Sequence, residues 1–398
     1  MTRPAWRKPG RCPSLRSAFS CRKRRVLCTT QHSLRSPVRS FSLPLLSKLI
    51  LVLNCGSSSI KFALFETSAG KVPRQRIWGG KVNGIGGTHP TCDTTAAPSV
   101  DLHLDPERPY HAALEHIRDL VVDYQGERRI AAVAHRVVHG GTKYFAPVRV
   151  DAAVLDDLRS YIPLAPLHQP FALEAIAALL EEYPRLPQIA CFDTAFHHTL
   201  PDVEKMLPID WEAWEGGLRR YGFHGLSYDY MSIALPERHG DLARGRTLVA
   251  HIGSGASLCA MHHLQSVGTT MGFSSLDGVM MGTRCGALDP GAVIYLMEIQ
   301  KLSLEEVGHM LYHRSGLLGI SGLSADTMDL LPVEHDNPRA RLALAVYVRS
   351  IAKQIATMAT TLGGIDLLVF TAGVGEHNAT IRERVCAELE WLGARLDP

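Results

Sequence analysis

An apolar run that stops abruptly in a glycine and three serines, LVLNCGSSSIK at residues 51–61, sets the first limit on the fold. Such a strand end presents backbone N–H groups, serine hydroxyls and the charge of Lys61 at one point, and Gly56 lets the backbone approach an anion closely. The pattern indicates a phosphate-binding loop in which Ser57, Ser59 and Lys61 contact a nucleotide. An ordinary serine-rich turn is the alternative that this motif alone leaves open.

The same design recurs twice further along the chain. Residues 247–257 read TLVAHIGSGAS, and residues 367–376 read LLVFTAGVGE. Aligning the first two copies places Asn54 over His251, as expected for a duplicated domain. No Walker loop and no GxGxxG fingerprint is present, so we predict three strand-end loops around one nucleotide. The second and third loops add these nucleotide ligands: His251, Gly253, Ser254, Gly255, Gly373, Val374 and Gly375.

Further motifs follow in one order between and around these loops. They are HRVVHGG at 135–141, PLAPLH at 163–168, FDTAFH at 192–197, RYGFHG at 220–225 and MGTRCG at 281–286. Together with the three loops they resemble the acetate kinase family over residues 49–398. The resemblance implies an α/β fold of two ribonuclease-H-like domains, as in the actin-like ATPase superfamily, with the active site in the interdomain cleft.

The resemblance also implies an activity: reversible, direct in-line phosphoryl transfer from ATP to acetate, giving acetyl phosphate and ADP. Because both reactants are anions, such a site must neutralise charge with cations rather than supply a protein nucleophile. Arg136 and Arg284 are the candidates, since a guanidinium binds carboxylate or phosphoryl oxygens in a bidentate manner. The resemblance makes His168, His224 and Asp193 catalytic residues as well.

Two further groups of residues complete the expected site. Asn54 and Glu376 offer hard oxygen ligands for Mg²⁺, with Mn²⁺ as the alternative ion, held between protein and nucleotide phosphates. The substrate's alkyl group is expected beside Arg136 and the pocket residues Val138, Leu167, Phe223 and Ser275. Two positions depart from the family pattern, because Ser254 stands where many relatives have Asn and Ser275 where the family has Pro.

Alternative functions stay open at this point. A propionate or butyrate kinase is the nearest rival, because one methylene changes binding in an apolar pocket by only about 1 to 3 kcal/mol. A relative that is truncated and inactive and only binds nucleotide is the other. The family usually adds a closing strand and helix beyond residue 398, and their loss would uncover a sheet edge and apolar surface.

The first 48 residues differ in composition from the rest. They hold 12 of the 42 Lys and Arg residues and no acid, so the remainder carries 30 basic against 39 acidic residues and is net negative. Such a segment is expected to be disordered. It reads as an organelle transit peptide, as translated upstream sequence or as a basic tail for an anionic partner. The expected location is therefore the cytoplasm, or a mitochondrion or plastid in the transit-peptide case.

The remaining sequence signals argue against other functional classes. The nine cysteines lack any CxxC pair, which argues against structural zinc and for a reducing compartment. No apolar run reaches the roughly 20 residues that a membrane-spanning helix needs. The acidic body carries no nucleic-acid signature. We expect a homodimer whose partners are ATP and acetate, without nucleic acid or membrane.

Hydrophobic periodicity outlines the domains. Strand patterns near 48–65, 130–138 and 188–191, with helices near 110–124 and 171–182, predict a first α/β domain over residues 49–193. A strand at 246–251, helices near 290–300, 304–312 and 337–362, and a strand at 365–370 predict a second, nucleotide-binding domain over residues 194–376. Residues 377–398 are expected to pack back on the first domain.

Overall fold

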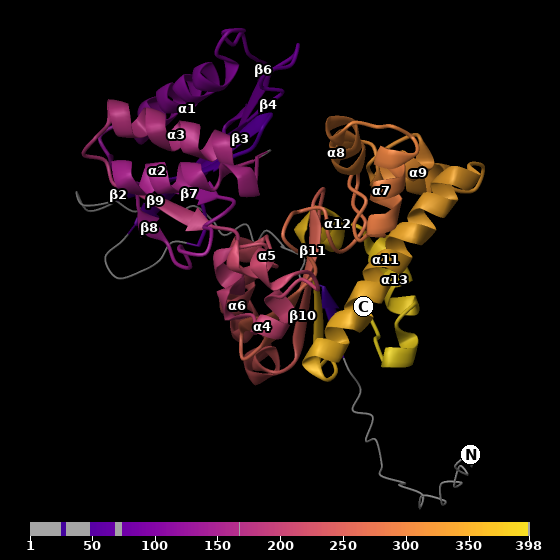
Figure 1. Cartoon of the computed structure of the whole chain (residues 1–398). Coiled ribbons are helices and arrows are strands. Elements are labelled where there is room, and N and C mark those ends of the chain that lie inside the picture. Colours follow the sequence, from indigo (N-terminus) through magenta and orange to yellow (C-terminus); the bar gives the residue numbers. More distant parts are fainter. Residues whose placement is uncertain (1–24, 29–47, 68–73, 167, 397–398) are drawn as a thin grey trace, which may run out of the picture.

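The protein folds into two α/β domains. The computed structural model describes residues 25–28, 48–67, 74–166 and 168–396. The N-terminal domain, indigo to magenta in Figure 1, and the C-terminal domain, magenta to yellow, each surround one sheet. This arrangement is the predicted fold class.

The N-terminal sheet is mixed. Its eight strands lie in the order β6-β5-β4-β3-β2-β7-β9-β8, and β2 pairs in parallel with β7, as β7 does with β9. The predicted run at 48–65 is in fact a hairpin of two antiparallel strands. The strands are β2 Lys48–Cys55, β3 Ser59–Thr67, β4 Trp78–Asn83, β5 Thr91–Thr94, β6 Ala97–Asp101, β7 Arg129–Val137, β8 Val148–Arg149 and β9 Gln188–Phe192.

Buried and half-buried residues alternate along β2, and this pattern shows which face of the sheet α1 and α3 cover. Leu49, Leu51 and Leu53 are buried in a core with the helices α1 (Pro109–Gln125) and α3 (Gln169–Glu182), while the residues between them are half-buried. Successive side chains of a strand point to opposite faces. Asn54 therefore lies on the face opposite to α1 and α3.

The C-terminal sheet lies between two helices. Its order is β1-β13-β10-β11-β12, and β10 pairs in parallel with β13 and antiparallel with β11. The helix α6 packs on Val249 and Val369, while α11 packs on the opposite face against Leu248 and Leu368. The elements are β10 Thr247–Ile252, β11 Ala256–His262, β12 Gln265–Thr269, β13 Leu367–Thr371, α6 Gly225–His239 and α11 Pro338–Leu362.

Shorter helices connect and flank these layers. As predicted, α11 ends at glycine: Gly363 adopts a left-handed φ of 68° that caps the helix. The other helices are α2 Ala152–Ser160, α4 Asp202–Lys205, α5 Trp211–Glu215, α7 Pro290–Glu298, α8 Leu304–His313, α9 Gly316–Ser321, α10 Thr327–Leu330, α12 Ala372–His377 and α13 Ala379–Ala387. The 3-10 helices are η1 Ile162–Leu164, η2 Ala195–Thr199, η3 Gly240–Arg244, η4 Leu331–Val333 and η5 Glu390–Leu392.

The placement of residues 377–398 corrects the sequence prediction. The helix α13 packs on α11 in the C-terminal domain, where Ile381 and Val385 join the hydrophobic core, and not on the N-terminal domain. Arg384 makes an ion pair with Glu334 at the same interface. Only Asn378 separates α13 from α12. The nearest apolar surface on which α13 can pack is therefore that of the C-terminal domain.

The expected disorder of residues 1–48 needs a correction where the structure describes this segment; residues 1–24 and 29–47 lie outside the described residues. Four of these residues form β1 (Arg25–Cys28), which pairs in parallel with β13 at the edge of the C-terminal sheet. Edge strands present unpaired N–H and C=O groups, and an extended segment can satisfy them whatever its net charge. Residue 48 starts β2 itself. None of the helices in the described ranges is long and apolar enough to cross a bilayer.

Three histidines are buried in the fold, namely His135, His139 and His197. Burial lowers the pKa of each to about 4. These rings are therefore neutral in the folded protein near pH 7, whereas they have a pKa of about 6.5 in an unfolded chain.

Between pH 4 and 6.5 the unfolded chain consequently binds more protons than the folded one, so stability is lost as the pH falls. Each ring is expected to contribute a loss of up to about 2 kcal/mol at pH 5. In His139→Asn the amide oxygen replaces Nδ1 as the acceptor for the Gly141 N–H, which lies 2.9 Å from it. We expect the thermal midpoint of this variant to fall less between pH 6.5 and 5 than that of the wild type. Equal slopes in the two proteins would contradict the neutral-ring assignment for His139.

Candidate active site

The first predicted loop is the turn between β2 and β3. The N–H of Gly56 donates to the carbonyl of Ser59 over 2.8 Å, which closes a tight hairpin around Ser57. Asn54 and Lys61 face each other as a register pair across the two strands. The hairpin thus places an amide, serine hydroxyls and an ammonium group at one end of the N-terminal sheet.

The second and third loops lie side by side in the C-terminal domain. The strands that precede them, β10 and β13, pair in parallel with His251 opposite Thr371. Gly253, Ser254 and Gly255 form the turn between β10 and β11, while Gly373, Val374 and Gly375 lie within α12. The carboxyl ends of parallel strands meet at one edge of a sheet, which is where α/β folds bind ligands.

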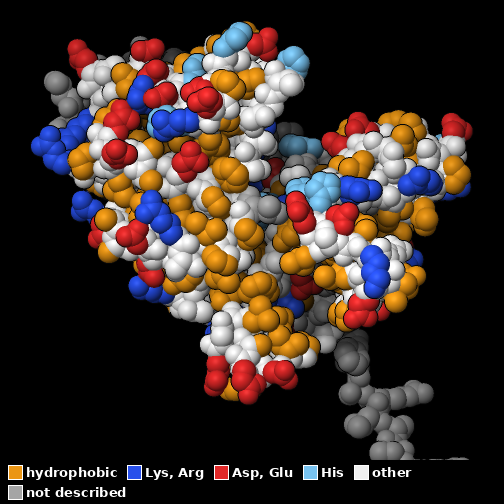
Figure 2. All heavy atoms as spheres, turned by 45° about the horizontal axis from the view of Figure 1, so that its top comes forward, with side chains coloured by type: hydrophobic (Ala, Val, Ile, Leu, Met, Phe, Trp, Pro, Cys, Tyr) orange, Lys and Arg blue, Asp and Glu red, His pale blue; other side chains and the backbone are white. Residues whose placement is uncertain are grey.

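A cavity of about 70 Å³ lies between the two domains. Since a water molecule takes about 30 Å³ of liquid volume, the cavity fits a ligand of a few heavy atoms. Figure 2 shows the domains on either side of the cleft. The N-terminal domain supplies Arg136, Val138, Leu164, Ala165, Pro166, His168 and Asp193 to its wall; the C-terminal domain supplies Phe223, His224, Met271, Ser274, Ser275, Arg284 and Tyr312.

Asp193 stands at the junction of the domains. Its side chain is 3% exposed, and Oδ2 accepts hydrogen bonds from Nε of Arg136 at 2.9 Å and from Nη2 at 2.5 Å. Nη1 of Arg136 donates to Oδ1 of Asn54 at 3.0 Å. The carbonyl of Asp193 accepts from the Gly225 N–H at 2.8 Å, and a Cβ on Gly225 would lie 2.1 Å from that carbonyl. The charge of Asp193 raises the pKa of Arg136, so this guanidinium keeps its charge.

Arg284 has a different environment. Its Nη1 donates to the Ser275 carbonyl at 3.2 Å, and it makes no ion pair within the part of the chain that the structure describes. Burial lowers its pKa below the usual value, and the positive charge of Arg136 acts in the same direction. The loop that carries it is fixed by Gly316, where a Cβ would lie 2.1 Å from the Met281 carbonyl. The cavity therefore contains one guanidinium without a counter-charge.

The cleft histidines are neutral. Burial, Arg284 and Arg136 lower the pKa of His168 to about 4, and burial lowers that of His251 to about 4. The pKa of His224 lies well below its ordinary value because of burial and of the neighbouring His251. The rings of His224 and His251 stack with centroids 4.2 Å apart. Each ring can therefore donate one N–H hydrogen bond to an anion without carrying charge.

The segment that holds Phe223 and His224 is tied to the loop at residues 271–278. Nη1 of Arg220 donates to the Thr270 carbonyl at 3.1 Å and to Asp277 at 3.2 Å. His224 itself adopts a left-handed φ of 59°, which is uncommon outside glycine and is found at functional sites. Ser275 consequently faces the cavity with Val138 and Phe223, on the wall where the alkyl group was expected.

The structure thus brings all of the predicted substrate and catalytic residues that it describes to one cavity. His251 stacks beside His224, and Gly255 lies close to both His224 and Arg284. Leu167 lies outside the described residues. Sequence reasoning missed six cavity residues, namely Leu164, Ala165, Pro166, Met271, Ser274 and Tyr312. Tyr312 comes from α8, where no motif marks it.

The expected Mg²⁺ ligands are compatible with an ion that also binds phosphates. Oδ1 of Asn54 is shared with Arg136, and Oε1 of Glu376 accepts from the Thr371 hydroxyl at 2.8 Å and the Ala372 N–H at 3.1 Å. Among the described residues, no three His, Cys, Asp or Glu side chains come together as a metal-binding group. Mg²⁺ in phosphate-transferring sites usually keeps waters and phosphate oxygens as ligands beside one or two protein groups, and this donor set fits that pattern.

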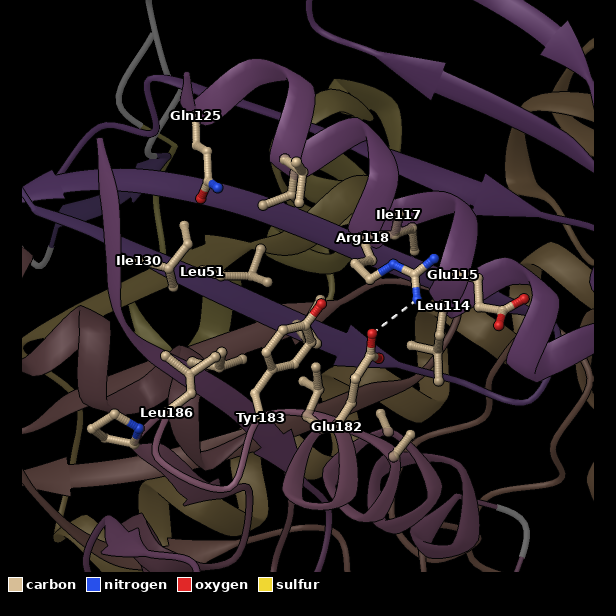
Figure 3. Close-up of a pocket in the computed structure, with 18 of the residues that line it drawn as sticks. Leu51, Leu114, Glu115, Ile117, Arg118, Gln125, Ile130, Glu182, Tyr183 and Leu186 are labelled. Carbon is tan, nitrogen blue, oxygen red and sulfur yellow. Dashed lines mark hydrogen bonds and ion pairs between the residues drawn. The ribbon is translucent and has the colours of Figure 1, made fainter. Parts of the chain in front are cut away.

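A larger groove of about 600 Å³ lies elsewhere, between α1 and α3 of the N-terminal domain. Figure 3 shows its apolar floor, which includes Leu51 and Ile130, and the ion pair of Arg118 and Glu182 that spans it at 3.0 Å. The groove contains none of the predicted site residues. None of its lining residues is a glycine or serine of the three predicted phosphate-binding loops, so size alone does not identify the site.

Comparisons with known proteins agree with the geometry. The acetokinase family model matches residues 49–398. An acetate kinase from Rhodopseudomonas palustris is 46% identical over 356 residues, covering 89% of this chain and 89% of that protein.

Solved structures give the same answer for the fold. A propionate kinase from Francisella tularensis subsp. tularensis SCHU S4 has a TM-score of 0.80 at 35% identity, covering 87% of this chain and 88% of that one. The acetate kinase of Porphyromonas gingivalis has a TM-score of 0.77 at 36% identity, with coverage of 87% and 88%. As its motifs predicted, the chain belongs to the acetokinase family.

Proposed function

We propose that the protein transfers the γ-phosphoryl group of ATP to acetate, reversibly, and so forms acetyl phosphate and ADP. The observation that carries this proposal is Arg284, a guanidinium without a counter-charge in a cavity of about 70 Å³. An anion of a few heavy atoms with a short apolar end satisfies both the charge and the apolar wall of Val138 and Phe223. The relatives named acetate kinase support the same substrate.

The chemistry follows from the charges. A carboxylate oxygen of acetate attacks the γ-phosphorus as the bond from that phosphorus to the leaving ADP oxygen breaks. Arg284 and Arg136 compensate the negative charge of the equatorial oxygens, while neutral His168, His224 and His251 donate hydrogen bonds. Asp193 is buried and doubly bonded to Arg136. We assign it the task of orienting that guanidinium, and no protein nucleophile is required.

The nucleotide is proposed to bind with its phosphates among the three loops. Gly253, Ser254, Gly255 and the α12 glycines would offer backbone N–H groups from the C-terminal domain, since glycine allows close approach of phosphate. Ser57, Ser59 and Lys61 would complete the site from the other domain. Asn54 and Glu376 would hold Mg²⁺ with the phosphates. The ion would neutralise phosphate charge and orient the γ-phosphoryl group.

A homodimer is also part of the proposal. The helix α7 has the apolar sequence PGAVIYLME, yet none of its residues is buried within this chain. Ile294, Tyr295 and the adjoining Ile299 are 55%, 52% and 63% exposed. Apolar residues gathered on one exposed helix are typical of surfaces that bind another protein chain, and a second copy is the partner we propose.

The direct test is an assay of the purified full-length chain with ATP and Mg²⁺. Acetate is expected to give acetyl phosphate, trapped as the hydroxamate, and acetyl phosphate with ADP should regenerate ATP. Propionate and butyrate are assayed in parallel. A folded protein that forms no acyl phosphate from any of the three would leave only the nucleotide-binding alternative.

The two arginines should differ when each is replaced. Arg284→Ala removes a cation without an ion-pair partner in the described structure, so turnover is expected to fall at least about a hundredfold while the thermal midpoint changes little. Arg136→Ala should lower both the turnover and the thermal midpoint, because it leaves Asp193 buried and unpaired. Lysine at either position should not restore the turnover, since an ammonium group lacks the planar fork of a guanidinium. Near-normal turnover of Arg284→Ala would show that this guanidinium is structural.

Ser275 tests the alkyl pocket. Because serine is smaller than the proline that the family pattern has here, propionate should be used with a kcat/KM within about tenfold of that for acetate. Ser275→Pro narrows the wall beside Val138 and Phe223 and should sharpen the preference for acetate. Measured kcat/KM values for acetate, propionate and butyrate decide the matter. Identical ratios in the two proteins would mean that this side chain does not limit substrate size.

A further inference from the structure

A chain of three hydrogen-bonding side chains runs from the buried side of α6 to the cleft. The hydroxyl of Tyr228 lies 2.5 Å from Oγ of Ser257, and this Oγ lies 2.8 Å from Nδ1 of His224. Tyr228 and Ser257 are both 0% exposed. Neither residue has a role in the chemistry described above, yet both reach a catalytic candidate from behind.

The proton positions along this chain follow from counting donors. If Tyr228 donates to Ser257, the serine hydroxyl has its own proton left for Nδ1 of His224, and every hydroxyl proton is placed. If the direction is reversed, His224 donates from Nδ1, Ser257 donates to Tyr228, and the tyrosine proton has no acceptor among the contacts of this chain. A buried donor without an acceptor is costly. The first direction is therefore favoured.

The electrostatics agree with this direction. Burial raises the pKa of Tyr228 well above its ordinary value, so its hydroxyl keeps its proton. Burial keeps the His224 ring neutral, as does the stacked His251, so the ring has a single N–H to place. With Nδ1 acting as the acceptor, the proton belongs on Nε2.

Nε2 is the nitrogen on the cleft side. A Cβ built on Gly255 would lie 3.3 Å from Nε2 of His224 and 3.6 Å from Nη1 of Arg284, so both groups border the second loop. We propose that Tyr228 and Ser257 are positioning residues that hold His224 in the tautomer protonated on Nε2, so that this N–H donates to the phosphoryl group in transfer. The donation from His224 to the phosphoryl group rests on the proposed function.

The tautomer is measured directly by ¹⁵N NMR of the full chain labelled on histidine, without substrate. The His224 signal is identified by its loss in His224→Gln. In the wild type we expect a proton on Nε2 and an unprotonated Nδ1. Ser257→Ala should produce a mixture of both tautomers, and Tyr228→Phe, which keeps the buried volume, should shift the ratio in the same direction. A wild-type ring protonated on Nδ1, or a ratio unchanged in Ser257→Ala, would overturn the proposal.

Turnover provides the second readout. Ser257→Ala should lower kcat about tenfold while KM for ATP and acetate changes less than about twofold, as for loss of a hydrogen bond made in the transition state. Ser266→Ala is the matched control, because Oγ of Ser266 lies 2.8 Å from Nδ1 of His197, another buried Ser–His pair outside the cleft cavity. It should leave kcat within about twofold and the His224 tautomer unchanged.

The two readouts also separate this proposal from the function on which it rests. A tautomer mixture in Ser257→Ala with wild-type kcat would overturn the catalytic part. A folded wild type without kinase activity would overturn the proposed function, while the expected tautomers would still support the hydrogen-bond assignment.

Discussion

The cleft depends on a single buried carboxylate. Asp193 directly follows β9 and has to be neutralised, because an unpaired charge on a side chain that is 3% exposed would be strongly destabilising. Arg136, near the end of the neighbouring parallel strand, satisfies it and is thereby aimed toward Asn54. The backbone carbonyl of Asp193 accepts a hydrogen bond from the N–H of Gly225, the first residue of α6. Asp193 therefore joins the N-terminal sheet, the Arg136 guanidinium and the start of α6, which follows His224.

A second consequence is an asymmetry between the two arginines of the cavity. Arg136 already has its counter-charge in Asp193. Arg284 instead donates a hydrogen bond to the Ser275 carbonyl, and its loop packs closely against Gly316. The surrounding histidines are kept neutral by burial, so they add hydrogen bonds but no charge. Among the described residues, the cavity thus offers one guanidinium without an ion-pair partner and several neutral hydrogen-bond donors. That balance suits an anion that must approach a second anion, since excess positive charge would hold the product as firmly as the transition state.

A comparison of two open spaces in the molecule illustrates why shape alone is a poor guide to function. The groove between α1 and α3 is much larger than the cleft cavity but is floored by leucine and isoleucine. The cleft cavity is small, but it brings together Arg136, Asp193 and Arg284 from both domains. Family membership, established from the family model and from a relative that is 46% identical, agrees with the smaller space.

The sequence by itself determined the local elements and the residues proposed for the site. Strands that end in glycine and serine, a helix that stops at Gly363 and an arginine in each of two motifs are short-range patterns, and each was found where the periodicity or motif placed it.

Only the tertiary structure decided which of those groups face one another. Tyr312 enters the cavity through the docking of α8, and the pairing of Arg136 with Asp193 arises from strand register. The packing of α13 on its own domain and the strand formed by Arg25–Cys28 likewise depend on surfaces that exist only after the sheets have formed. Local patterns specify strands and turns because backbone geometry has a fixed period, while contacts between distant segments depend on packing that no local window contains.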